Sequence, residues 1–332
     1  MLKSPIFINI NTVEISITQK IKQYLKTFPL LVKLKRAVWS LFVSSKPKPP
    51  EILTDRNYFS KAFSSSHNIK SITFDKGLVV GNFRGTSYFL NIRPQNHIES
   101  YVFLHELWEP HIAELIAGYL NEPKAAVVDV GANIGATSIP LAKHFPNVSF
   151  HLFEPHPIVF DDLNHNLSFN KLSNVNAKNV AITDTGSSMM PFYAQRNAKN
   201  FGLSSFTLNN NIEDYEVIQV KCEALDEILS DQICVKVIKV DTQGHELQVL
   251  RSAQKLIAKQ RPVIFFEFES DYFSESIETD TKNEILRFFK ELHYELYMLV
   301  NGRRFLPRVT LREYFHGDII AVPLSINTSK KI

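Results

Sequence analysis

The fold of this chain is decided by the stretch AAVVDVGANIG, residues 125–135. Its first six residues are apolar except for Asp129 and contain no turn former, which is typical of a strand buried on both faces of a parallel sheet. Gly131 and Gly135 bracket a tight turn, and the apolar spacing over residues 137–145 predicts a helix directly after it. We therefore expect a crevice at the carboxyl end of this strand, faced by the N–H groups of the helix N-terminus.

The glycine spacing and two nearby acids indicate the kind of ligand. A dinucleotide-binding turn has three glycines as G-x-G-x-x-G, whereas this turn lacks the middle glycine and follows Asp129. Glu154 ends the next apolar run, nineteen residues after Gly135, where a carboxylate can accept both hydroxyls of a ribose. An adenosine ligand with a cationic centre and an amino-acid tail fits these features, so we expect S-adenosylmethionine as cofactor. A nicotinamide dehydrogenase is a weaker alternative, and a purely structural role for both acids is another.

A second group of polar residues follows the β-branched run at 235–240. Asp241 ends that run, Gly244 allows a tight turn, and Glu246 begins the next helical pattern. His245 lies beside them, and an unperturbed histidine titrates near neutral pH. Glu267 interrupts the apolar run at 263–268, where an acid is costly to bury unless it is paired or lies at the strand end. Each acid alone is more often a helix cap or an ion-pair partner, but their repetition at successive strand ends favours a reaction site.

Strands and helices alternate through the rest of the chain, which predicts a doubly wound α/β sheet. A period of two ahead of the glycine turn predicts a small β meander, and the following segment returns to a helical period. Asp184 follows another strand, at a point where an adenine ring could lie. The predicted elements are a meander at 69–92, helices at 101–120 and 158–169, strands at 175–182, 217–222, 235–240 and 263–268, and a hairpin and loop at 189–211 that we interpret as a lid.

The N-terminal arm differs from the body in charge. Residues 1–50 carry nine Lys and Arg and one Glu, whereas the whole chain has a net charge of only +3, so the body is mildly acidic. The body therefore offers no broad basic track for nucleic acid. Residues 14–43 have apolar side chains at helical spacing. Such a helix can lie in a membrane interface near anionic lipid, or it can dock on the body or on a partner subunit, and the sequence favours neither. Two cysteines, Cys222 and Cys234, and no signal peptide favour a cytoplasmic protein.

The segments around these acids resemble the FkbM family of S-adenosylmethionine-dependent methyltransferases. The resemblance spans about residues 106–269, and one departure is that Thr242 and Gln243 stand where the commoner family form has valine and glutamate, so any role of that glutamate is absent. The segments that carry the resemblance are WEP (108–110), VVDVGANIG (127–135), FEP (153–155), LD (225–226), KVDTQGHE (239–246) and FE (266–267).

The resemblance implies a class I methyltransferase fold, which is an α/β fold with a Rossmann-like, mostly parallel sheet and one antiparallel edge strand. It also implies O-methylation of a hydroxyl on a sugar, glycan or other small-molecule natural product. A catalytically silent binding protein tethered to a membrane-associated assembly is the alternative. Asp241 and Glu246 are the favoured catalytic candidates, with His245 and Glu267 behind them, and no metal is expected. The expected cofactor-binding residues are Glu109, Asp129, Gly131, Asn133, Gly135, Glu154, Pro155 and Asp184.

These expectations divide the chain into three parts. Residues 1–50 form a basic amphipathic helical arm with a proline-rich linker, 51–100 a small β region, and 101–325 the methyltransferase domain. The expected partner is a small-molecule or glycan acceptor. Peripheral contact with the inner face of the membrane through residues 14–43 and a homo-oligomer both remain open.

Overall fold

The computed structural model describes residues 69–72, 77–93, 96–122, 124–195, 204–206, 213, 215–269, 275–300, 303–305 and 317–324. The predicted basic arm and its linker, residues 1–50, lie outside the described residues, as does much of the segment 189–211 that we interpreted as a lid. No helix within the described part of the chain is both long enough and apolar enough to cross a membrane.

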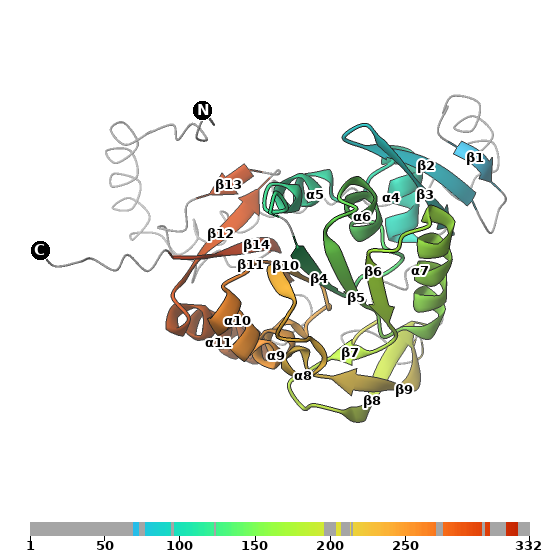
Figure 1. The fold of residues 1–332 in the computed structure, drawn as a ribbon. Helices are drawn as coiled ribbons and strands as arrows, with labels where there is room; N and C mark the ends of the chain where they lie inside the picture. The colour runs from blue at the N-terminus through green and yellow to red at the C-terminus, as the bar shows by residue number, and fades with distance from the viewer. Residues whose placement is uncertain are drawn as a thin grey trace, which may run out of the picture. The chain divides into compact units, whose positions relative to one another are not determined.

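An eight-stranded sheet forms the centre of the described body (Figure 1). Its five consecutive strands from β11 to β6 are parallel, and β14 pairs antiparallel with β11 on one side and β12 on the other. The predicted mostly parallel α/β sheet is thus confirmed. The strands, in sheet order, are β13 (Arg303–Phe305), β12 (Tyr294–Val300), β14 (Gly317–Pro323), β11 (Val263–Phe268), β10 (Cys234–Val240), β4 (Ala125–Val130), β5 (Ser149–Phe153) and β6 (Val175–Lys178).

The central strands consist mostly of apolar residues because helices cover both faces of the sheet. All six residues of β4 and all six of β11 are buried. One face packs against the helices that flank the glycine turn, and the other packs against the helices of the C-terminal half. The first group is α4 (His97–His105), α5 (Pro110–Ala117), α6 (Ser138–His144) and α7 (Pro157–Asn170); the second is α8 (Leu225–Ile228), α9 (Glu246–Ser252), α10 (Gln254–Gln260) and α11 (Glu275–Glu291).

The predicted β meander is present as an antiparallel sheet of β1 (Ile69–Ile72), β2 (Gly77–Phe83) and β3 (Thr86–Ile92). It shares an apolar core with α6 and α7. Two asparagines of α7 bond the open edge of β3: Asn166 exchanges hydrogen bonds with the backbone of Asn91, and Asn170 does the same with Phe89. These side chains replace the neighbouring strand that the edge of β3 lacks.

Two predicted elements are each divided in the structure. The predicted helix at 101–120 is interrupted between α4 and α5, where Glu106 and Glu109 have φ of 69° and 44° and Pro110 starts a new helix. The predicted strand at 175–182 divides into β6 of the main sheet and β7 (Ala181–Ile182). β7 belongs to a separate sheet with β9 (Tyr215–Glu223) and β8 (Ser188–Gln195).

Candidate functional site

The glycine turn lies against the end of β10. Gly131 has φ of 79°, and a Cβ on it would stand 1.9 Å from the carbonyl oxygen of Asp241. The backbone N–H of Asp241 in turn donates to the carbonyl of Val130 at 3.0 Å. Gly135 also has positive φ, of 84°, but its Cβ would first meet the side-chain ends of Ile139 and Leu163. The turn after β4 and the end of β10 are therefore in backbone contact, which brings the two acidic segments of the sequence to one crevice.

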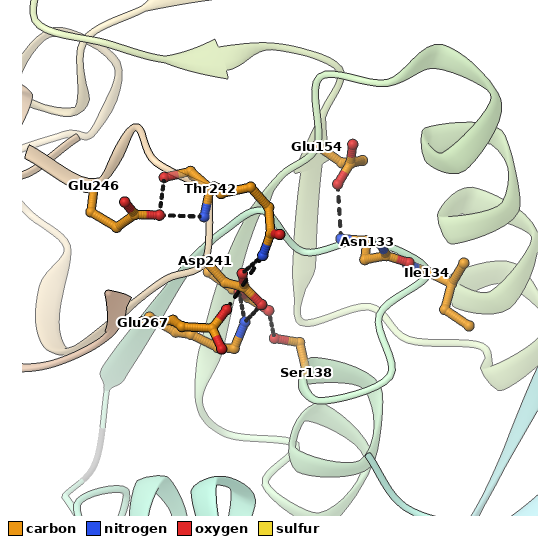
Figure 2. A network of polar contacts seen from close by, with 11 residues as sticks. Asn133, Ile134, Ser138, Glu154, Asp241, Thr242, Glu246 and Glu267 are labelled. Carbon is orange, nitrogen blue, oxygen red and sulfur yellow. Dashed lines mark hydrogen bonds and ion pairs between the residues drawn. The ribbon is translucent and has the colours of Figure 1, made fainter. Parts of the chain in front are cut away.

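Glu154 ties the end of β5 to this glycine turn. One carboxylate oxygen accepts the N–H of Asn133 at 2.9 Å and the other accepts the N–H of His156 at 2.9 Å. Figure 2 shows the Glu154 side chain reaching toward Asn133, with Asp241 at the end of a different strand. Burial raises the pKa of Glu154 to about 7, against the opposing effect of the two N–H groups. A cationic ligand or hydroxyl donors would stabilise its ionised form.

Asp129 is buried beneath the glycine turn. Its Oδ2 accepts a hydrogen bond from Ser138 Oγ at 2.5 Å, at the start of α6. Its Oδ1 lies 3.7 Å from the ammonium of Lys239, on the neighbouring strand β10. Among the described residues, this Oδ1 accepts no hydrogen bond. A buried carboxylate with an unused acceptor fits the amino group of an amino-acid tail.

Asp241 and Glu267 lie together on the other side of the crevice (Figure 2). The amide of Gln243 donates to Asp241 at 2.9 Å and to Glu267 at 3.3 Å. They line a pocket with about 270 Å³ of empty volume, which has four carboxylates and the ammonium of Lys239 on its wall. Its lining comes from β10, β11, β14 and the start of α5: Glu109, Ile112, Lys239, Val240, Asp241, Phe265, Phe266, Glu267, Asp318 and Ile319.

Glu246 turns back on its own loop instead of lining this pocket. Its carboxylate accepts the N–H and the hydroxyl of Thr242 at 3.1 Å, and the N–H of Gly244 at 3.1 Å. It is 3% exposed, and burial raises its pKa to about 7. This arrangement fixes the turn that carries Asp241.

His245 is buried against the ring of Phe206, with the ring centroids 4.6 Å apart. Burial lowers its pKa to about 4, although the nearby carboxylate of Asp184 opposes the shift. Its imidazole is therefore neutral at physiological pH and a weak base. Asp184 itself is exposed and lies two residues after the end of β7. These two residues lie near each other, whereas the pocket lined by Asp241 and Glu267 includes neither of them.

The remaining predicted residues support the crevice in different ways. Glu109, the N-cap residue of α5, lines the pocket beside Lys239. Asn133 has φ of 51° and its side chain accepts the N–H of Ile134 at 2.8 Å, which holds the glycine turn. The carbonyl of Pro155 accepts a hydrogen bond from the Asn179 side chain. No group of three or more His, Cys, Asp and Glu side chains in the described part of the chain is arranged to hold a metal ion.

Three residues of the site were missed by the sequence analysis. Lys239 and Ser138 both contact Asp129, and Gln243 bridges the two pocket acids. Lys239 could have been found, because a lysine inside a β-branched buried strand needs a buried acid beside it. Gln243 carries no such signal, since a glutamine in a turn is usually exposed.

A parallel sheet with a glycine turn after its first core strand, and acids at the ends of β4, β5 and β10, defines a Rossmann-like nucleotide-type site. Residues 129–296 match the family model described as the methyltransferase FkbM domain. Because this match covers half of the chain, the chain belongs to the FkbM methyltransferase family, and the predicted membership is confirmed.

Two curated relatives are similar to this chain over part of its length. Methyltransferase 1 of Beauveria bassiana is 26% identical over an alignment of 141 residues that covers 38% of this chain and 57% of that protein. Methyltransferase sdnD of Sordaria araneosa is 24% identical over an alignment of 185 residues that covers 48% of this chain and 70% of that protein. The chain thus spans only a little over half of the first relative. Among solved structures, methyltransferase FkbM from Methylobacillus flagellatus KT has 16% identity and a TM-score of 0.41, covering 68% of this chain and 52% of that one.

Proposed function

We propose that the protein is an S-adenosylmethionine-dependent O-methyltransferase that acts on a hydroxyl of a sugar, glycan or other small molecule. The observation that carries the proposal is the crevice itself. A buried acid at the end of β5 is bonded to a glycine turn after β4, and Asp241 at the end of β10 lies across that crevice beside a pocket. Membership in the FkbM methyltransferase family supports the same chemistry.

The residues on the β4 and β5 side fit the cofactor. Asp129 and the turn at Gly131 would hold the amino-acid tail, and Glu154 would accept the ribose hydroxyls. Asp184 would lie toward the adenine. When bound, the cofactor supplies an electrophilic methyl group on a cationic sulfur. The carboxyl groups around this crevice favour a cationic ligand over an anionic one.

The residues on the β10 and β11 side fit the acceptor. Asp241 keeps 23% of its side chain exposed, so an acceptor hydroxyl can reach it. Carboxylates are good acceptors for sugar hydroxyls, and a base within hydrogen-bond reach removes the proton from the attacking oxygen. We assign this role to Asp241, with Glu267 beside it. Glu246 holds the turn that carries Asp241, and His245 is the weaker candidate because its pKa is low.

Cofactor binding is tested by calorimetric titration with S-adenosylhomocysteine. Glu154→Gln should weaken binding at least about ten-fold, since a hydrogen bond to a charged group contributes roughly 1.5–3 kcal/mol. Glu99→Gln is the matched control, because Glu99 is also a buried acid that accepts a backbone N–H, but on α4 outside the crevice. Equal affinity in wild type and Glu154→Gln would remove Glu154 from the site.

Catalysis is tested with cofactor carrying a labelled methyl group. Extracts rich in glycans and small metabolites should gain label in a product whose methyl group is an ether on oxygen, and Asp241→Asn should abolish this gain. Tight binding of S-adenosylhomocysteine without any transfer would instead favour the silent binding protein. Label on nitrogen or carbon would refute the assignment of O-methylation.

A further inference from the structure

Lys239 lies between the two halves of the proposed site. Register pairs it with Asp129 on β4, and Asp241 follows two residues later, directly after the end of β10. Its Nζ is 3.7 Å from Asp129 Oδ1 and 3.5 Å from Asp241 Oδ2. The side chain is 9% exposed and lines the pocket. One ammonium group therefore spans an acid of the cofactor side and an acid of the acceptor side.

Acidic side chains from several neighbouring elements surround the ammonium of Lys239. Burial alone would lower the pKa of Lys239, but four carboxylates raise it above its usual range, so the side chain stays protonated and is not a base. These four are Asp129 from β4, Asp241 from β10, Glu109 from the start of α5 and Glu267 from β11. Asp318 of β14, which also lines the pocket, pairs with His111 of α5 at 3.5 Å.

We propose that Lys239 is a positioning residue: its ammonium pairs with Asp129 and Asp241 at once and holds the two carboxylates at a fixed separation, which aligns the cofactor tail with the acceptor base. This role rests on the proposed methyl transfer. The two acids lie at neighbouring strand ends and repel each other when both are charged. A single buried cation between them offsets that repulsion. Loss of the cation would leave this repulsion without compensation and favour a change in the side-chain rotamer of one acid.

The matched variants come from one strand. Lys239→Met removes the ammonium and keeps an apolar side chain of similar length, and Lys239→Arg restores a positive charge. Lys236→Met is the control, because Lys236 is also on β10 and also pairs with an acid, Glu122 at 2.6 Å, away from the crevice. Unfolding in urea checks that each variant folds cooperatively.

The first readout is the pH profile of kcat/KM for labelled methyl transfer. An opposite charge at this distance changes a carboxylate pKa by roughly 1–3 units, so the acidic limb in Lys239→Met should move up by about one unit or more. At pH values below the limb, the ratio of kcat/KM in Lys239→Met to that in wild type should be at least about ten-fold lower than the same ratio on the plateau. Lys239→Arg should restore most of the profile, and Lys236→Met should follow wild type. An unchanged limb in a folded Lys239→Met protein would overturn the proposal.

The second readout needs neither turnover nor cofactor, so it separates this proposal from that of methyl transfer. Crystal structures of ligand-free wild type and Lys239→Met should differ in the side-chain positions of Asp129 or Asp241. Both carboxylates in unchanged positions would overturn the role of Lys239, whatever the activity of the wild type. Displaced carboxylates in a protein that transfers no methyl would retain Lys239 as a positioning residue and refute the proposed function alone.

Discussion

As the pH rises, the ligand-free Glu154→Gln variant should become more stable relative to the ligand-free wild type. Burial raises the pKa of Glu154 from 4.5 to about 7. Between these values the folded state binds more protons than the unfolded state, so the free energy of unfolding falls as pH rises. The loss is absent below about pH 4.5 and complete above about pH 7. At about 1.4 kcal/mol per pKa unit, it amounts to about 3 kcal/mol.

Glutamine does not titrate, so the variant lacks this loss. The free energy of unfolding of Glu154→Gln minus that of wild type should therefore rise by about 3 kcal/mol from pH 4.5 to pH 7 and then level off. A glutamine has one carbonyl oxygen for two backbone N–H donors, at Asn133 and His156. The unpaired donor costs about 1–3 kcal/mol at every pH, which lowers the whole difference curve without changing its slope.

Urea denaturation without ligand, at several values between about pH 5 and pH 8, measures this difference. Glu99 and Glu246 also have raised pKa values, of about 8 and 7, but both are present in each protein and cancel. Glu246→Gln is the matched control: its curve should tilt similarly, while its affinity for S-adenosylhomocysteine should change less. Parallel pH curves for wild type and Glu154→Gln would refute the assignment of a raised pKa to Glu154.

Two further substitutions test the scaffold of the crevice. Gly131→Ala should lower the free energy of unfolding more than Gly135→Ala, measured in urea, because its Cβ would meet a rigid backbone oxygen at 1.9 Å and not flexible side-chain ends; equal losses would refute this reading of the turn. Asn170→Ala should cost about 1–3 kcal/mol and speed hydrogen exchange at the Phe89 amide, whereas Asn121→Ala, which loses only an exposed bond of 3.4 Å, should match wild type. Unchanged exchange at Phe89 would contradict the role of Asn170.

The strands of the core could be predicted from the sequence because a strand that is buried on both faces consists almost entirely of apolar residues. The runs at 125–130 and 263–268 are almost wholly apolar, and each became a fully buried strand of the sheet. The glycine turn was predictable for a related reason, since positive φ at Gly131 and its contact with Asp241 leave no room for a side chain. The break in the 101–120 helix had a signal that we did not use: Pro110 disfavours helical backbone at Glu109.

Another departure depends on tertiary contacts that no local pattern records. The strand predicted at 175–182 changes sheet at Asn179, where the side chain bonds the carbonyls of Glu154 and Pro155. Residues Ala181–Ile182 then pair with β9 instead of continuing beside β5. A run of residues with strand propensity cannot show which of two sheets it will join. Propensity describes how well the residues fit a pleated strand, and it does not depend on which strand pairs with them.

The direction in which an acid points is the part of the site that sequence spacing leaves undetermined. Glu154 and Glu246 both lie between a strand of the central sheet and the body of the helix that follows it, and burial raises both pKa values to about 7. They differ in the origin of their donors. The N–H groups that Glu246 accepts come from its own turn, at Thr242, Gly244 and Glu246 itself, so its carboxylate stabilises that turn. Glu154 accepts one N–H from the turn after β4, twenty-one residues away, and so joins two strand ends across the crevice. A ligand bound in that crevice would perturb the acid that spans it far more than the acid that caps its own loop.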